Sequence, residues 1–124
     1  MTKLFFLSVI GIISYAIYSR NKLRKNFLLT TGKVTECRFL PKSGGNISLI
    51  YEYNLNSNLI SQSSTRKGIT VNDCNTHLLG KTFPVSFNPD DSELSMILME
   101  PSDFEDFGYN FPDSLKWVSL YFKE

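Results

Sequence analysis

The stretch Ile47-Ser48-Leu49-Ile50-Tyr51-Glu52-Tyr53-Asn54-Leu55 decides the fold, because polar and apolar residues alternate along it. This two-residue period is typical of a β-strand with one buried face. The apolar face carries Ile47, Leu49, Tyr51, Tyr53 and Leu55. We expect this face to be core, so its two tyrosines are not expected to stack on nucleotide bases.

Turn signals flank this strand on both sides. Pro41-Lys42-Ser43-Gly44-Gly45-Asn46 precedes it, after a first strand candidate over residues 27–40 in which Gly32 marks a bulge or bend. Asn56-Ser57-Asn58 follows it and can supply the left-handed conformations of a tight hairpin. The hairpin predicts a returning strand over residues 59–65, whose polar composition favours an edge of the sheet.

The period changes between residues 66 and 80. Asn72 or Asp73 can cap a short helix there. A strand is predicted next, over residues 82–87, in which phenylalanine and valine alternate with polar residues and proline. Its Pro84 lacks an amide hydrogen, so this strand lies at an edge or its proline points away from the neighbouring strand.

The last strand is predicted over residues 93–99, after an Asn-Pro-Asp-Asp turn. Because the connections between strands are short, neighbouring strands are expected to be antiparallel. We expect a mainly β (α+β) fold: an N-terminal transmembrane helix, then a five-stranded antiparallel curled sheet or small, partly open barrel. One short helix would precede the fourth strand, and another would lie near the C-terminus.

An uncharged run over residues 4–18 predicts the transmembrane helix. A helix of this length spans about 22 Å, short of the roughly 30 Å hydrocarbon core, but snorkelling of Lys3 and Arg20 extends its reach. The first interpretation is a retained single-pass anchor. A cleaved signal peptide, with Ser14-Tyr15-Ala16 as the cleavage site, and a buried core helix are the alternatives. The anchor residues are Leu4, Phe5, Phe6, Leu7, Val9, Ile10, Ile12, Ile13, Tyr15, Ile17 and Tyr18.

Basic residues follow the apolar run directly and are expected at the membrane surface. Under the positive-inside rule they place the rest of the chain on the cytoplasmic side. They would also favour anionic lipid headgroups, so the lipid bilayer is one expected partner. The four residues are Arg20, Lys22, Arg24 and Lys25. The predicted organisation is an anchor with its basic segment (1–26), a small β domain (27–100) and an acidic, aromatic tail (101–124).

Charge and cysteine content limit the function classes. The net charge is +1, and of 13 Lys and Arg five precede residue 26, which leaves eight against 12 Asp and Glu in the remainder. This acidic remainder disfavours nucleic acid as a partner. Cys37 and Cys74 are too few for a disulfide scaffold; one bond between them is possible in an oxidising compartment and not expected in the cytosol.

No constellation of residues with catalytic or metal-binding spacing is present. Cys74 and His77 form a Cys-x2-His pair, but metal sites need three or four ligands and a nucleophile needs an orienting group and oxyanion donors. Asp90, Asp91 and Glu93 lack the spacing of a calcium loop. We therefore expect a protein that is not an enzyme, with no catalytic residue, metal site, cofactor or small-molecule substrate.

The C-terminal tail departs from the strand pattern. Ser102 and Glu105 fit a capping box, which predicts a short helix through Phe107, and Asp113 can cap a second one. The second helix is expected to cover the open face of the sheet, with an interfacial or partner-binding aromatic patch as the alternative. A possible partner patch consists of Asp103, Glu105, Asp106, Trp117 and Tyr121.

Three blocks carry a resemblance to a known family. They are Gly32-Lys33-Val34, Tyr51-Glu52-Tyr53 and Gly80-Lys81-Thr82-Phe83-Pro84-Val85-Ser86-Phe87-Asn88-Pro89. Over residues 27–99 the chain resembles a widespread bacterial family of membrane-tethered small β domains of unknown function. Many members close with a second hydrophobic helix, which this chain lacks. The resemblance implies the β fold and a bacterial inner membrane, and it implies no catalytic residues.

Three functions from different classes follow. The first is a non-catalytic, membrane-anchored β domain that serves as a protein-interaction or accessory module of a membrane complex. The second is an immunity-like or antitoxin-like protein that neutralises a partner through its acidic segment, residues 100–113. The third, an enzyme or metal protein using Cys74 and His77, ranks last. The acidic segment and the basic residues 20–25 are also candidate partners of each other.

Overall fold

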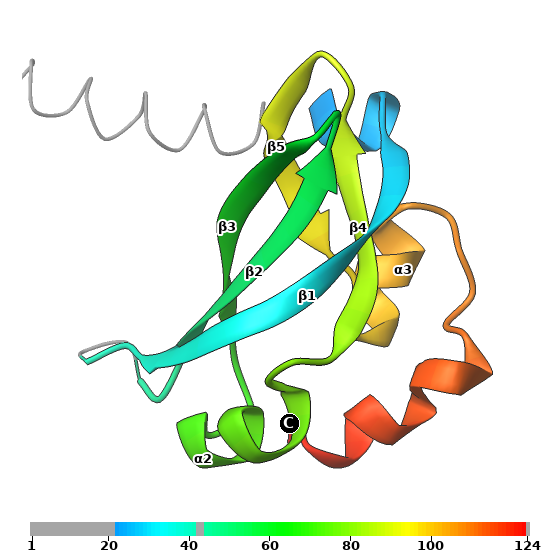
Figure 1. Cartoon of the computed structure of the whole chain (residues 1–124). Helices are drawn as coiled ribbons and strands as arrows, with labels where there is room; N and C mark the ends of the chain where they lie inside the picture. The colour runs from blue at the N-terminus through cyan, green and yellow to red at the C-terminus, as the bar shows by residue number, and fades with distance from the viewer. Residues whose placement is uncertain (1–21, 42–43, 124) are drawn as a thin grey trace, which may run out of the picture.

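The computed structural model describes residues 22–41 and 44–123 (Figure 1). Five strands form its central sheet, and short helices connect or cover them. The strands are β1 (Leu28–Phe39), β2 (Ile47–Leu55), β3 (Asn58–Arg66), β4 (Thr82–Asn88) and β5 (Asp91–Ile97). The helices are α2 (Val71–Asp73), the π-helix η1 (Cys74–Leu78), α3 (Pro101–Asp106) and the 3₁₀-helix η2 (Asp113–Leu120).

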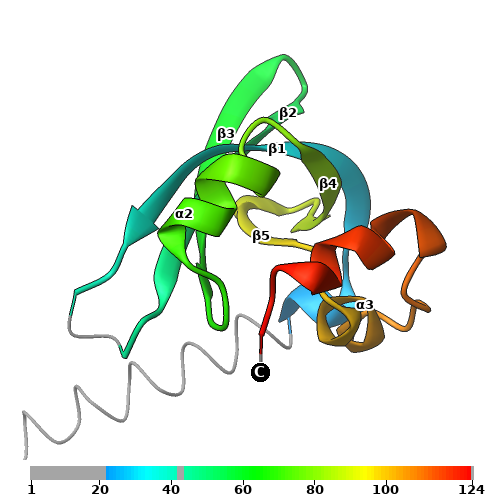
Figure 2. The same cartoon turned by 90° about the horizontal axis from the view of Figure 1, so that it is seen from below.

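The strands form one antiparallel sheet in the order β3-β2-β1-β4-β5. Three consecutive strands are joined by hairpins and the fourth returns beside the first, which is a Greek key. The sheet curls until β5 approaches β3, so the barrel is nearly closed (Figure 2). With α2 and η1 between β3 and β4, this is the topology of an OB fold. The predicted five-stranded antiparallel sheet is confirmed, and of its two predicted forms, a curled sheet or a small, partly open barrel, the structure shows a nearly closed barrel.

Local chemistry explains how these strands meet. Asn56 and Ser57 have φ of 51° and 67°, the type I′ turn conformation that fits a two-residue hairpin, and Leu55 faces Asn58 across it. β1 pairs with β4 through its first half and with β2 through its second half. A bulge between Val34 and Glu36 separates the halves, so β1 bends and belongs to both walls of the barrel.

Gly32 is required by packing and lies two residues before the bulge. A Cβ atom built on Gly32 would lie 2.5 Å from Cγ2 of Val85 on β4. The glycine therefore lets β1 and β4 approach each other inside the barrel. The sequence predicted an irregularity in β1 correctly but placed it at Gly32, whereas the bulge lies between Val34 and Glu36. Glycine is found both at bulges and where strands approach closely, so its presence alone does not distinguish the two.

The barrel interior is the main core. As predicted, the apolar face of β2 is buried, and Tyr51 and Tyr53 are 1% and 2% exposed. Both hydroxyls reach across to β5: Tyr51 Oη lies 2.8 Å from Ser95 Oγ, and Tyr53 donates to the Ser92 carbonyl. This core comprises Val34, Cys37, Ile47, Leu49, Tyr51, Tyr53, Ile69, Cys74, Leu78, Phe83, Val85, Phe87, Ile97, Met99 and Val118.

A second, smaller core lies outside the barrel, beside β5. Its buried residues are Leu23, Leu98, Phe104 and Phe107, and Leu94 and Met96 of β5 pack against them. α3 and the helical turn at residues 22–25 therefore cover the outer surface of the β5 region.

The C-terminal segment closes one end of the barrel. In Figure 1, η2 lies at the same end as α2 and η1. Val118 of η2 is fully buried, and the Trp117 ring lies 6.1 Å from that of Phe83 on β4. The prediction that this helix packs on the sheet is confirmed, although it is a 3₁₀-helix. The capping prediction for α3 is wrong: Asp103, and not Glu105, closes the first turn, because the helix begins at Pro101.

A disulfide joins the two cysteines. It links Cys37 of β1 to Cys74 of η1, with a Cα–Cα distance of 6.2 Å, and both residues are buried. It ties the end segment α2–η1 to the barrel wall.

The predicted fold class is wrong in one respect, its N-terminal transmembrane helix. None of the helices in the described residues is long and apolar enough to cross a membrane. The longest, η2, has eight residues, whereas a span needs about 20. The predicted anchor, residues 4–18, lies outside the described residues.

Candidate functional site

The outer face of β1, β2 and β3 is mostly polar, with exposed Leu59 of β3 as an apolar exception, in contrast to the covered face of β5. Figure 1 looks onto β1 and β2, and no helix of the described residues lies in front of them. The strand register places three rows of outward side chains across this face. The rows are Lys33–Glu52–Ser61, Glu36–Ile50–Ser63 and Arg38–Ser48–Thr65. The face thus combines hydroxyl groups with two cations and two carboxylates, and it is electrically balanced.

This outer face contains a hollow of about 470 Å³. The β1 bulge shapes it, because the extra residue Thr35 turns its hydroxyl to the Ile50 carbonyl, 3.3 Å away. Half-buried Ile50 lies among the polar lining residues. The lining residues are Thr35, Glu36, Arg38, Ile50, Ser61, Gln62 and Ser63. Three rigid strands therefore build a shallow polar hollow.

An exposed ion pair lies in this hollow. Arg38 Nε donates to Glu36 Oε1 over 2.7 Å. The hydrogen bond from Arg38 lowers the pKa of the Glu36 carboxyl, and the same bond raises the pKa of Arg38. Both groups therefore stay charged across the physiological range and present a fixed dipole to solvent.

Arg66, at the end of β3, and Asp103 on α3 are the most buried charged residues in the described part of the chain, each 5% exposed. Arg66 Nη1 donates to Asp103 over 2.7 Å and to Glu100 over 3.0 Å, and Arg66 Nη2 donates to the Ile97 carbonyl over 2.7 Å. Asp103 also accepts hydrogen bonds from the backbone N–H groups of Met99 and Glu100. Arg66 thus joins β3 to the end of β5 and to α3, so its role is structural.

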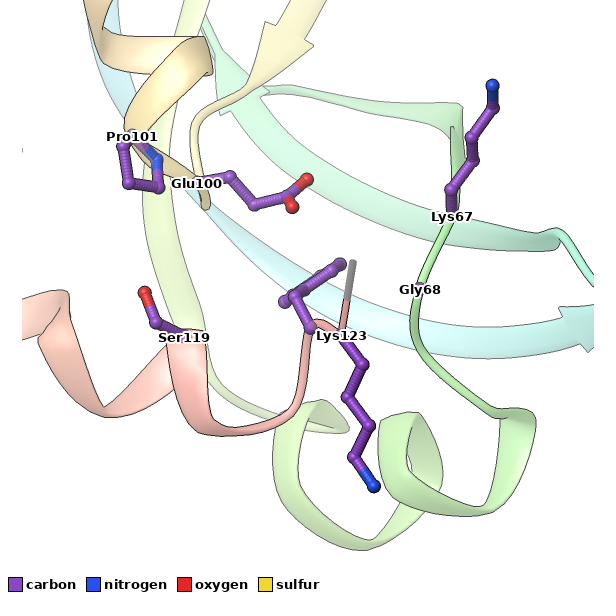
Figure 3. A pocket seen from close by; sticks show the side chains of 7 residues that line it. Lys67, Gly68, Glu100, Pro101, Ser119 and Lys123 are labelled. Atoms are coloured by element: carbon purple, nitrogen blue, oxygen red, sulfur yellow. The ribbon is translucent and has the colours of Figure 1, made fainter.

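A second hollow, of about 570 Å³, lies between α3, η2 and the segment after β3 (Figure 3). Lys67 and Lys123 point away from each other there, and Glu100, which also accepts from Arg66, points inward. Gly68 has φ +77° and its carbonyl accepts a 2.6 Å bond from the Lys123 N–H. The hollow thus forms where the C-terminal segment is hydrogen-bonded to the segment after β3. Its two lysines, Lys67 and Lys123, do not point to a common site.

The predicted partner patch is divided in the structure. Asp103 is buried with Arg66, and Asp106 lies 3.5 Å from Arg24. Trp117 packs on the barrel core, while the ring of Tyr121 stacks on His77 at 3.9 Å. Of the five residues, Glu105 is exposed and has no ion pair among the described residues. The acidic segment and the basic residues before β1 do meet, through Arg24 and Asp106.

Cys74 and His77 do not form a reactive pair. The Cys74 sulfur is bonded to Cys37, and the His77 ring is stacked on Tyr121. Among the described residues no group of three or more His, Cys, Asp and Glu side chains is placed to hold a metal ion.

Of the predicted membrane-surface residues, three are described. Lys22, Arg24 and Lys25 lie on the helical turn before β1, and Leu23 between them is buried. This turn is tied to the barrel, because the Asn26 backbone carbonyl accepts from the Asn88 side chain and the Asn26 side-chain amide donates to Asp90. Arg20 and the anchor residues lie outside the described residues.

The sequence did not indicate the outer face or Arg66. Serines and threonines on a strand give no signal beyond exposure, and register across three strands is needed to bring them together with Glu36 and Arg38. Strand alternation could have indicated Arg66, because it lies on the same face of β3 as the inward residues Ile60, Gln62 and Ser64.

The chain was compared with known proteins. It matches no protein-family model, no curated protein and no solved structure. The resemblance to the bacterial family of membrane-tethered β domains stays a prediction.

Proposed function

We propose that this chain is a non-catalytic protein-interaction module that binds a protein partner through the outer face of β1, β2 and β3. One observation carries the proposal: this face is hollowed and polar, while the chain covers its own outer surface at β5. By fold analogy, OB-type barrels bind their ligands on the face of strands 2 and 3.

The chemistry of the face favours a protein over other ligands. Nucleic acid binding by such a sheet needs aromatic platforms and excess positive charge. Here the tyrosines of β2 point into the core, and Lys33 and Arg38 are matched by Glu52 and Glu36. A mixed-charge, hydroxyl-rich surface suits the polar rim and hydrogen bonds of a protein interface.

Site-specific photo-crosslinking in the source cells tests this proposal. A crosslinking amino acid at Thr35 lies in the hollow, whereas one at Asn75 lies on exposed η1 at the end of the barrel. We expect a discrete protein adduct from position 35 and none from position 75. The same adducts from both positions, or none from either, contradicts the proposal.

A matched pair of charge reversals identifies the contact. Arg38→Glu breaks the exposed Arg38–Glu36 pair in the hollow, and Lys116→Glu breaks the exposed Lys116–Asp113 pair on η2. Arg38→Glu should weaken the adduct from position 35 and Lys116→Glu should leave it unchanged. Equal effects of both variants would point to net charge and against a binding site at this face.

We also infer that the barrel folds in an oxidising compartment. A buried disulfide favours this, because thiols stay reduced in the cytosol. The inference departs from the positive-inside rule, which placed this part of the chain in the cytoplasm. Acid quenching of intact cells, followed by thiol alkylation of the denatured protein and mass measurement, tests it: no reactive thiol supports the inference, and two reactive thiols contradict it.

A further inference from the structure

In the part of the chain that the structure describes, β3 has one paired edge and one unpaired edge. The type I′ turn makes Leu55 and Asn58 a hydrogen-bonded pair, and hydrogen-bonded and non-hydrogen-bonded pairs alternate from there along β2 and β3. Ile50 and Ser63 are then a non-hydrogen-bonded pair, which agrees with the Ile50 carbonyl pointing to Thr35 on β1. The residues of β3 whose backbone groups point away from β2 are Leu59, Ser61, Ser63 and Thr65.

These backbone groups have no partner within the described residues. No backbone hydrogen bond joins β3 to β5, which pairs with β4 alone. Side chains bridge the two strands instead, as with Arg66 and the Ile97 carbonyl. Figure 2 shows the loop end of the β2–β3 hairpin standing clear of β5. Within residues 22–41 and 44–123, the outward edge of β3 therefore has no backbone hydrogen-bond partner.

The two edges of the sheet differ in how they are protected. Natural edge strands avoid unwanted pairing through charges, prolines, bulges or covering elements. β5 has such features: it carries Asp91 and Glu93, its register against β4 is interrupted between Asp91 and Ser95, and its Ser92 and Ile97 carbonyls accept from side chains. β3 is nine residues long and carries no proline, bulge or charge before Arg66. An edge of this kind is either an aggregation hazard or an interface.

We propose that β3 pairs with β3 of a second copy of this chain, antiparallel about a two-fold axis at Gln62. In this register Ser61 faces Ser63 of the second copy, and Leu59 faces Thr65. Every outward residue then meets an outward residue, so all of the free backbone groups are satisfied. Because residues 58–65 carry no charge, no like charges meet across the interface.

This dimer would enlarge the surface to which the proposed function assigns partner binding. Pairing of the β3 strands joins the two outer faces into one continuous polar surface of six strands. The inference rests on the proposed function only in assigning a use to that surface, since dimerisation itself is independent of any further partner.

Sedimentation velocity of the purified full chain over a wide range of concentrations tests the dimer, with two matched double variants. We expect twice the chain mass for the native protein. Ser61→Lys with Ser63→Lys places like charges opposite each other and should weaken dimerisation about tenfold or more. Ser61→Lys with Ser63→Glu introduces as many charges, but each lysine faces a glutamate of the second copy, so the dimer should persist.

A proline substitution probes the same edge through the backbone. The Ser63 N–H points away from β2, so Ser63→Pro removes a bond of the dimer and none of the barrel. It should yield a folded monomer, whereas Ser63→Ala should stay dimeric. If Ser63→Pro fails to fold, the two charge variants decide.

A native chain that is monomeric at every concentration overturns the proposal, and so does equal behaviour of the two charge variants. A monomer that still forms the specific adduct from position 35 overturns the dimer and leaves the proposed function standing. A native dimer that forms no adduct from position 35 overturns the proposed function and leaves the dimer standing.

Discussion

The two halves of the barrel treat their outer surfaces in opposite ways. Outside β5, the chain lays α3 and Leu23 over apolar side chains and makes a second core. Outside β1, β2 and β3 it leaves a hollowed face of hydroxyl and charged groups. The comparison separates the half of the barrel whose outer residues hold the fold together from the half that carries the proposed binding face: the first can be changed only at a cost to folding, and the second has fewer packing contacts to lose.

Asp103→Ala should have the largest effect on the free energy of unfolding, because Asp103 connects α3 on the covered half to Arg66 of β3. The substitution leaves the Arg66 charge buried without its closest partner and removes the acceptor of two backbone N–H groups. We expect a loss of about 4 kcal/mol in the free energy of unfolding, measured by urea denaturation. Glu105→Ala, an exposed change on the same helix, should cost less than about 0.5 kcal/mol. Similar losses in both variants would contradict a structural role for the Arg66 pair.

Removal of the disulfide by Cys37→Ser with Cys74→Ser comes next. The bond closes a segment with a sequence separation of 37, so its loss should lower the free energy of unfolding by about 3 to 4 kcal/mol. Thermal unfolding of the variant and of the native protein, each with and without reductant, measures this. Reductant should destabilise the native protein alone; a native protein insensitive to reductant under unfolding conditions would speak against the bond.

A pair of truncations compares the two outer surfaces directly. Leu98 is fully buried beneath α3, and Leu98→Ala should cost about 3 kcal/mol. Ile50 is half-buried in the hollow, and Ile50→Ala should cost about 1 kcal/mol, since less surface returns to water. Chemical denaturation of both variants is the measurement. Equal losses would show that the outer face of β1–β3 is also covered in solution.

The last prediction concerns Tyr51 and the pH dependence of the free energy of unfolding, which should change little near neutral pH. Burial raises the pKa of Tyr51 to about 12, although the hydrogen bond with Ser95 opposes this. Because the folded state holds the proton more tightly than the unfolded chain, this contribution is full below about pH 10 and is lost as the pH rises toward 12. The free energy of unfolding should therefore fall over that window, and Tyr51→Phe should reduce the fall. Tyr53, whose pKa is also raised by burial, contributes in the same direction.

Much of the barrel could be predicted from local patterns. Alternation in residues 47–55 identified β2 and its buried face, and the polar residues 59–65 identified an edge strand. Pro84 was consistent with an edge or with a proline that points away; β4 lies inside the sheet, so the second alternative holds. These signals succeed because strand period and turn chemistry act over a few residues.

What the sequence did not predict depends on contacts between distant segments. Asp103 looked like a surface acid, because nothing near it in the chain indicates that Arg66 lies 2.7 Å away. Trp117 and Tyr121 were predicted to belong to a partner patch. In the structure the Trp117 ring packs against Phe83, and the Tyr121 ring stacks on His77. The outer face of β1–β3 depends on register across three strands, which no single stretch encodes.

The division of β1 between two walls has a consequence for the order of folding. The β1–β2–β3 meander uses neighbouring segments, and hairpins of this kind form in about 1–10 µs. The β1–β4 ladder sets Leu28 opposite Phe87, and pairing at such long range is slow. During synthesis the meander therefore precedes the closed barrel, and the edge of β1 that later pairs with β4 stays available to chaperones and other nascent chains until β4 arrives.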